Sequence, residues 1–310
     1  MNPAPFIQPL LALLRAGLAL ALSPLLLGVI NRTKASFAGR NGQPLLQSYY
    51  DLWKLLHKGA VYSRTTTWVF RAGPIIGLAA VLAATTLVPL GGLPSTVSFS
   101  GDLVLFAYLL GLTRFFTVIA ALDTGSSFEG MGASREVTFS ALAEPALLLG
   151  LAALARQSGS LSLSSIYSSL SFDAWLEVGP MLALVVAALM VVLLAENARI
   201  PVDDPNTHLE LTMIHEVMVL DHSGPDLAFI LYNAALKLWV LSALLAGLII
   251  PIRSGNPWLD GGACLLGMLV IAIIIGIIES SMARLRLLRV PQLLVGASAL
   301  AVVALILSLR

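Results

Sequence analysis

Residues 177–196 read EVGPMLALVVAALMVVLLAE and carry no charge between the two terminal glutamates. About 20 mainly apolar residues is the length that a helix needs to cross the hydrocarbon core of a bilayer. Other segments of the chain share this length and composition. The sequence therefore predicts eight transmembrane helices, at about 5–30, 68–92, 102–122, 138–157, 177–196, 228–251, 262–281 and 290–309.

The composition of the 310 residues excludes a soluble globular protein. Hydrophobic residues make up 58% of the chain, charged residues 11%, and the mean hydropathy is +0.91. A soluble domain carries roughly a quarter charged residues. The net charge of +1 gives no overall positive potential that would attract nucleic acid. The chain has one cysteine, Cys264, which excludes a metal site built on several thiolates of this chain. We predict an all-α membrane protein that forms a single polytopic domain over residues 1–310.

The segments that connect the spans alternate in basic content. The segments after the first, third, fifth and seventh spans, which lie on one side of the membrane, carry eleven basic residues: Arg32, Lys34, Arg40, Lys54, Lys58, Arg64, Arg135, Arg199, Arg284, Arg286 and Arg289. The segments on the other side carry only Arg156, Arg253 and Arg310. Short loops rich in Lys and Arg stay on the cytoplasmic side of a membrane. We therefore expect a multi-pass protein of the cytoplasmic (inner) membrane with both termini outside.

The first of these loops is expected to contain an amphipathic helix. Its apolar residues follow the spacing of one helix face: Leu45, Leu46, Tyr49, Leu52, Trp53 and Leu56. Asp51, Lys54 and Lys58 fall on the other side. This pattern is typical of a helix that lies flat in the lipid–water interface, with the aromatic rings at headgroup level.

Charged residues inside spans need a reason, because a charge at the centre of a span costs about 2.5–3.5 kcal/mol on insertion scales. We single out Arg114, Glu144, Lys237 and Glu279. Pro145 cannot donate to the carbonyl of Ala141, which leaves an acceptor beside the Glu144 carboxyl. The four charges could form static ion pairs that hold helices together. For Glu144 we favour a step in a proton path.

The densest group of acids follows the fifth span and includes Glu196, Asp203, Asp204 and Glu210. Pro201 and Pro205 prevent a continuous helix there, and the spacing of Thr207 and Glu210 predicts a capping box that opens a new one. Capping accounts for only some of these acids. Crowded carboxylates in a poor dielectric repel, which raises some of their pKa values toward neutrality and suits them to coupling chemistry.

Other motifs give no site. The histidines at 208, 215 and 222 recur every seven residues, which places them about 10 Å apart on a helix and excludes a shared metal ion. Asp123-Thr-Gly-Ser matches the aspartic-protease string, but that chemistry needs two such aspartates. A Gly-x-x-x-x-Gly-Lys phosphate loop is absent from the sequence. We expect no catalytic residue and no metal site in this chain.

Several motifs nevertheless resemble those of one family, and they follow its order along most of the chain. The first loop reads Gly39-Arg-Asn-Gly-Gln-Pro and then Leu46-Gln-Ser-Tyr-Tyr-Asp-Leu-Trp-Lys-Leu; the others are Leu122-Asp-Thr-Gly-Ser-Ser-Phe, Gly132-Ala-Ser-Arg-Glu, Glu144-Pro-Ala-Leu-Leu-Leu-Gly and Glu279-Ser-Ser-Met-Ala-Arg-Leu-Arg-Leu. The chain thus resembles the membrane-anchor subunit of energy-converting [NiFe] hydrogenases and formate hydrogenlyase (a hydrogenase-4 type component). That subunit is itself similar to the quinone-chamber heel subunit of respiratory complex I.

The chain departs from the family pattern at three places; the first change reshapes a turn, and the other two weaken the interpretation as a quinone chamber. The Gly-Pro of the first loop is Gly42-Gln43-Pro44, and the Glu-Arg-Lys start of quinone-reducing relatives is Asn31-Arg32-Thr33. After the fifth span, Asp203 and Glu210 match, but two family acids are replaced by Asn206 and His208. An ion-coupling role is compatible with all three changes.

The resemblance implies a chain without a cofactor of its own. Its implied partners are a small iron–sulfur subunit with a [4Fe-4S] cluster and a large [NiFe]-type subunit on the cytoplasmic face, antiporter-like membrane subunits beside it, and the lipid bilayer. We assign Glu144, Glu196, Asp203, Asp204 and Glu210 to an ion or coupling path; their counter-charges are Arg114, Arg135, Arg199 and Lys237. The residues that match the family motifs are Asp123, Gly125, Glu136, Pro145, Pro201 and Glu279.

Three other functions remain open at the level of sequence. The chain could be a quinone-binding subunit of a complex I-like dehydrogenase, or a pure membrane anchor whose acids serve only assembly. It could also be a stand-alone transporter, although such carriers often show two similar halves and no convincing internal repeat occurs here.

Overall fold

The computed structural model of the chain describes residues 7–91, 93–203, 213–252 and 254–309. Within these ranges the fold is helical and contains no strand. The elements are α1 (Ile7–Phe37), α2 (Gln47–Leu56), α3 (Trp68–Leu87), α4 (Asp102–Asp123), α5 (Ser127–Ser158), α6 (Leu163–Ser169), α7 (Phe172–Glu196), η1 (Glu216–Val219), α8 (Gly224–Ile249), α9 (Pro257–Ser281), η2 (Leu287–Arg289) and α10 (Val290–Leu307).

Eight of the helices in the described ranges are long and apolar enough to cross a membrane, which confirms the predicted number of spans. The bounds differ in places for local reasons. α5 begins at Ser127 instead of 138, because its first three turns are polar and extend the helix beyond its apolar part. α3 ends at Leu87 instead of 92, since Pro89 disfavours a helical conformation in the residue before it.

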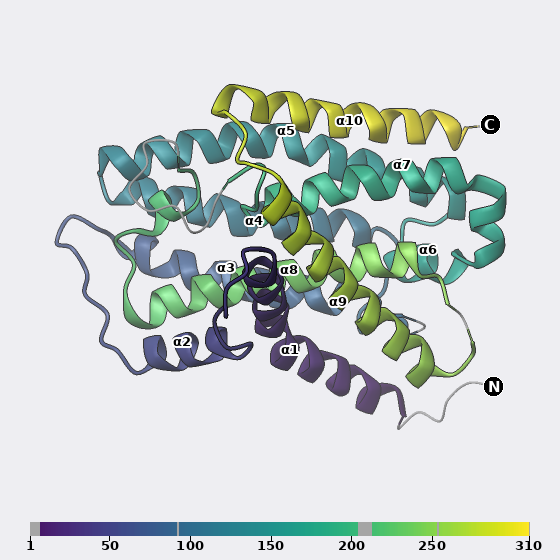
Figure 1. The fold of residues 1–310 in the computed structure, drawn as a ribbon, viewed down its shortest axis with the longest axis horizontal. Coiled ribbons are helices and arrows are strands. Elements are labelled where there is room, and N and C mark those ends of the chain that lie inside the picture. The colour runs from purple at the N-terminus through teal and green to yellow at the C-terminus, as the bar shows by residue number, and fades with distance from the viewer. Residues whose placement is uncertain (1–6, 92, 204–212, 253, 310) are drawn as a thin grey trace.

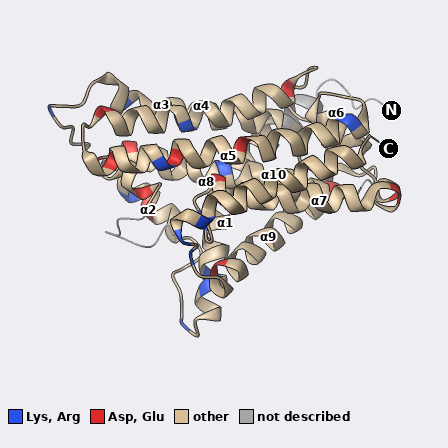
Figure 2. Ribbon diagram, turned by 90° about the horizontal axis from the view of Figure 1, so that it is seen from above, with Lys and Arg blue, Asp and Glu red and all other residues tan. Residues whose placement is uncertain are grey.

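α8 packs against α1, α3, α7 and α9, and its apolar residues from Ala235 to Leu248 are almost all buried. α3 lies against α4 and α8, while α10 lies against α5 and α7. α1 begins and α10 ends at the same end of the molecule, as an even number of crossings requires (Figure 1). α1 and α9 pair with each other and lean away from the other spans (Figures 1 and 2).

The predicted amphipathic helix of the first loop is α2. It packs against α8 and α1, and the Tyr49 hydroxyl donates to the carbonyl of Ala21. Leu46, Trp53 and Leu56 remain exposed, Trp53 at 67%. α2 therefore presents apolar side chains that the rest of the chain does not cover, as a helix in the lipid–water interface requires.

Four spans contain an internal proline (Pro24 in α1, Pro74 in α3, Pro145 in α5 and Pro180 in α7), and each proline removes one backbone hydrogen bond from its helix. In α1, Pro24 has no N–H for the carbonyl of Leu20, and that carbonyl instead accepts a hydrogen bond from the Tyr232 hydroxyl at 2.8 Å. In α7, Val178 leaves helical geometry two residues before Pro180. α5, by contrast, continues through Pro145 as one helix.

Candidate functional site

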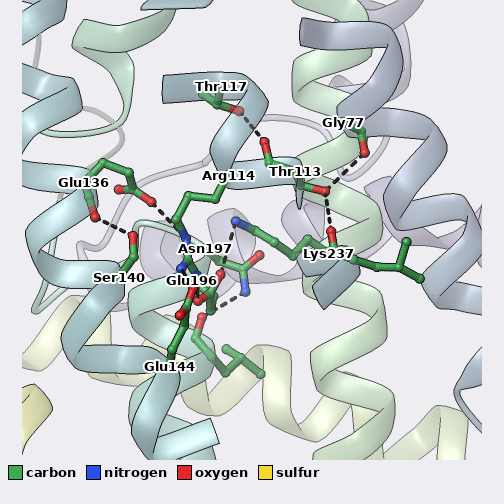
Figure 3. Close-up of polar contacts among 12 residues, drawn as sticks. Gly77, Thr113, Arg114, Thr117, Glu136, Ser140, Glu144, Glu196, Asn197 and Lys237 are labelled. Atoms are coloured by element: carbon green, nitrogen blue, oxygen red, sulfur yellow. Dashed lines mark hydrogen bonds and ion pairs between the residues drawn. The ribbon is translucent and has the colours of Figure 1, made fainter. Parts of the chain in front are cut away.

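Arg114, in the α4 span, lies at the centre of a group of carboxylates from two other helices (Figure 3). Its Nη1 lies 2.7 Å from Oε1 of Glu144, and its Nε lies 3.6 Å from Oε1 of Glu136. Its Nη2 pairs with Glu196. Lys237 of α8 lies 3.7 Å from the other oxygen of Glu196. We call these five residues the Arg114 cluster.

Each member is positioned by its helix. Glu136 and Glu144 are separated by roughly two turns of α5, so both can face α4. Glu196 is the last residue of α7, where the chain leaves the span. Lys237 comes from the central helix α8 and approaches Glu196 from the other side (Figure 3).

The cluster has an unbalanced charge. Three carboxylates face the two cations Arg114 and Lys237, which leaves one surplus negative charge if all the carboxylates are ionised. The side chain of Glu196 is only 3% exposed, so its charge depends on its partners. The side chain of Glu144 is 50% exposed at the side of the bundle. An intramembrane carboxylate in that position needs cover from water or from another subunit.

Two cavities adjoin at Arg114 and Glu136. Each is small, with a volume of about 20 Å³, which is room for about one water molecule. The lining of the first includes Asp203 and Ile214, and the lining of the second includes His215 and Lys237. The two linings therefore extend from the cluster to residues that flank 204–212.

His215 is a neutral polar group at the wall of the second cavity. Burial lowers its pKa to about 4, and the nearby Lys237 acts in the same direction. The backbone N–H groups of Ile214 and His215 donate to Oδ2 of Asp203 at 3.2 and 3.1 Å. These bonds hold the segment against the turn that follows α7.

A second group of charges lies where that turn meets α1 and α9. Glu279 lies 2.8 Å from Nζ of Lys34 and 3.3 Å from Nη1 of Arg199; we call these three residues the Glu279 cluster. Next to it, Asp203 pairs with Arg284 at 2.9 Å. The backbone N–H of Leu285 donates to the carbonyl of Pro201 at 3.0 Å. The turn 197–203 therefore links α7 to the segment that follows α9.

The family-motif residue Asp123 has a structural position at the end of α4. Its carboxylate accepts the backbone N–H of Thr67 at 2.7 Å, the Thr67 hydroxyl at 2.9 Å and the N–H of Phe70 at 3.3 Å. It thereby caps the first turn of α3. Gly125 follows with a φ of +71°, which a residue with a side chain rarely adopts, and this lets the chain turn into α5.

The structure brings together the predicted residues Glu144, Glu196, Arg114 and Lys237, and joins Asp203, Arg199 and Glu279 in the adjacent region. Arg135 lies beside this region and donates to the carbonyl of Met213 at 3.0 Å. Asp204 and Glu210, and with them the predicted capping box at Thr207, lie outside the described residues.

Sequence reasoning missed several partners. Lys34 and Arg284 were counted only as loop charges, and Glu136 only as part of a motif, because nothing local indicates the distant acid or base that each one meets. It also passed over Arg15 inside the first span. The Arg15 guanidinium is buried and donates to the carbonyls of Val88, at 2.6 Å, and Pro94. Its position as a lone arginine in an apolar span could have indicated, from the sequence alone, that Arg15 has buried hydrogen-bond partners.

No group of three or more His, Cys, Asp or Glu side chains in the described part of the chain is arranged to hold a metal ion. The Arg114 cluster combines carboxylates with cationic side chains, and carboxylates in such surroundings can take up and release a proton.

Comparison with known proteins places the chain in a family. The family profile described as NADH dehydrogenase matches residues 10–309. Formate hydrogenlyase subunit 4 of Escherichia coli (strain K12) is 34% identical over 289 residues, which cover 91% of this chain and 92% of that protein. Hydrogenase-4 component C of the same organism is 33% identical over 263 residues, which cover 85% of this chain and 81% of that protein.

The fold also matches a solved structure. A chain of the membrane-bound sulfane sulfur reductase, an archaeal respiratory membrane complex, superposes with a TM-score of 0.82 at 21% sequence identity, covering 98% of this chain and 99% of that one. The resemblance inferred from the motifs is confirmed by these matches. The chain belongs to the NADH dehydrogenase family, as a multi-pass membrane subunit of the complex I-like hydrogenase and formate hydrogenlyase type.

Proposed function

We propose that this chain has no redox centre and couples electron transfer in hydrophilic partner subunits to translocation of protons or sodium ions. The observation that carries the proposal is the Arg114 cluster, in which three carboxylates share two cations inside the spans. With all three carboxylates ionised the cluster carries one surplus negative charge, which a mobile proton or sodium ion would neutralise. A site that alternately holds and releases such an ion is what translocation needs.

The two cavities and the turn 197–203 support a connection between this site and a partner. The turn begins directly after Glu196 and ends at Asp203, so it touches the Arg114 cluster at one end and the Arg284 ion pair at the other. A partner that moves the turn would change the surroundings of Glu196. By reciprocity, an ion gradient acting on Glu196 would then act on the partner's reaction.

The partners follow from the family and from the charges. We infer that a small subunit with a [4Fe-4S] cluster and a large [NiFe]-type subunit dock on the face that carries the basic first loop and the acidic residues of 196–227. That face would be cytoplasmic in the inner membrane, with both termini outside. The half-exposed Glu144 supports an antiporter-like membrane subunit seated against α4 and α5, because such a subunit could cover the carboxylate.

The test is ion translocation by the native complex in sealed vesicles, with electron transfer measured in parallel. Glu144→Gln keeps the size of the side chain and removes its charge, so we expect normal assembly and loss of ion uptake. Glu177→Gln, an exposed position on α7, is the matched control and should pump normally. Unchanged pumping in the Glu144 variant would favour a pure anchor instead.

A further inference from the structure

A wide cavity lies where the ends of α1 and α9 meet, apart from the Arg114 cluster. It has a volume of about 460 Å³ and is open to the surface, and its walls include Lys34, Phe37, Arg40, Gly42, Glu279 and Ser280. Helices α1 and α9 lean away from the other spans here (Figure 2). The cavity therefore lies at the periphery of the chain, where lipid would meet it.

The charges around this cavity are predominantly positive. Glu279 is the one acid among its lining residues, and its carboxylate is already shared by Lys34 and by Arg199, which lies behind it. Arg40 adds another cation, and it forms no ion pair with any residue that the structure describes. Two cations therefore pair with the one carboxylate, and a third, Arg40, lines the same cavity. A ligand that carries negative charge would be stabilised there, whereas a neutral one would gain nothing from the surplus.

Apolar surface leads away from the cavity along α9. Ile277, Ile273, Val270 and Leu266 precede Ser280 at alternating intervals of three and four residues, which places all of them on one face of the helix. All four are exposed. On the α1 side, Phe37 is 61% exposed at the rim of the cavity. The site therefore combines a basic cavity with an uncovered apolar stripe that starts at its edge.

We propose that this cavity binds the headgroup of an anionic phospholipid, with the phosphate near Lys34 and Arg40 and the acyl chains along the α9 stripe. Basic pockets between transmembrane helices are a known type of site for anionic headgroups. The stripe favours a phospholipid over free phosphate, because free phosphate has no acyl chain that could pack against apolar side chains. The surplus positive charge favours an anionic lipid over a zwitterionic one.

The experiment uses the full-length chain, purified in mild detergent with the subunits that accompany it. A photoactivatable phosphatidylglycerol is added, cross-linked and mapped by peptide mass spectrometry, and a phosphatidylcholine probe of the same chain length serves as the comparison. We expect phosphatidylglycerol to label peptides that cover residues 266–280, and phosphatidylcholine to label them several-fold less.

Variants then test the cations. Arg40→Ala should weaken phosphatidylglycerol binding about five-fold, the value that corresponds to one Lys or Arg near an anionic surface, and Arg40→Glu should weaken it further. Lys54→Ala removes an exposed cation of α2 outside the cavity and should change nothing. Equal labelling by the two lipids, or unchanged labelling of the Arg40 variants, would overturn the proposal. So would displacement of the lipid by millimolar inorganic phosphate or by a neutral short-chain quinone.

Discussion

Glu196 and Arg199 stand in one turn of chain but belong to different ion-pair clusters. Glu196 pairs with Arg114 and Lys237 inside the spans, whereas Arg199 pairs with Glu279 beside α1. A shift of this turn therefore cannot leave either cluster unchanged. The two ion-pair clusters are thus joined through a few residues of backbone.

Arg114 should be essential for stability as well as for ion movement. Arg114→Gln leaves three carboxylates with Lys237 alone, and removing one partner from buried ion pairs costs about 3–5 kcal/mol. We expect a large fall in the thermal denaturation midpoint in detergent. Adding Glu196→Gln should restore much of it, while Arg64→Gln, at an exposed loop position, should have no effect. A stable single variant would show that the cluster contributes little to folding.

Asp123 should act as a cap and not as an ion carrier. Asp123→Ala removes the acceptor for the N–H groups that open α3 and should lower the free energy of unfolding by about 1–2 kcal/mol. Asp123→Asn keeps one acceptor oxygen and should cost less. Asp173→Ala, at an exposed position on α7, is the control and should stay within about 0.5 kcal/mol of the parent. Ion pumping per folded molecule should not change; a specific loss of pumping would assign Asp123 to the path.

Two glycines of α5 should respond in opposite ways to alanine. A Cβ at Gly132 would lie 2.9 Å from the carbonyl oxygen of Ile214 and 3.1 Å from Met218, so Gly132→Ala must displace the η1 segment. A Cβ at Gly130 would meet nothing within 4 Å, and Gly130→Ala should gain up to about 1 kcal/mol from helix propensity. Thermal denaturation of both variants measures the difference. If Gly132→Ala raised the denaturation midpoint, the η1 segment would have to move aside without loss of stability, and the prediction would be wrong.

Stability should fall in mild acid because of His222. This residue stacks on Phe70 with ring centroids 3.9 Å apart, and burial lowers its pKa to about 4. The unfolded chain, with an ordinary histidine pKa near 6.5, binds a proton first as the pH falls, so the folded state loses about 1–2 kcal/mol between pH 7 and pH 5.

The matched pair His222→Phe and His57→Phe isolates this effect. His222→Phe keeps an aromatic ring against Phe70 and should remove about half of the decline of the denaturation midpoint between pH 7 and pH 5, because buried His215 has a similarly lowered pKa and accounts for a like share. His57 is the exposed residue that caps the C-terminus of α2, so its replacement should leave the decline intact. An identical pH dependence in the parent and in His222→Phe would contradict the assignment.

The spans were predictable because length and hydropathy act locally. Residues 177–196 can satisfy their backbone groups in lipid only as a helix, and the same holds for the other seven spans. The ends of the helices were harder to predict from hydropathy. The polar first turns of α5, from Ser127, are helical but do not belong to its apolar part.

The ion pairs depend on tertiary packing and could be predicted only in outline. Arg114 and Glu144 could be identified as charges that need partners, because a lone charge in a span is unfavourable. The sequence alone does not show which residues that are distant along the chain lie close together in space. It therefore could not pair Lys34 with Glu279 or place Glu136 next to Arg114. The roles assigned to Asp203 and Glu196 in ion movement stay predictions.

The lean of α1 and α9 gives the molecule two unlike flanks in the plane of the membrane. On one flank, α4 and α5 carry the half-exposed Glu144 carboxylate; on the other, α9 carries exposed aliphatic side chains beside a basic cavity. If the two proposals above hold, a complex built on this chain would extend laterally from the α4–α5 flank only, and the α9 flank would stay in contact with the bilayer.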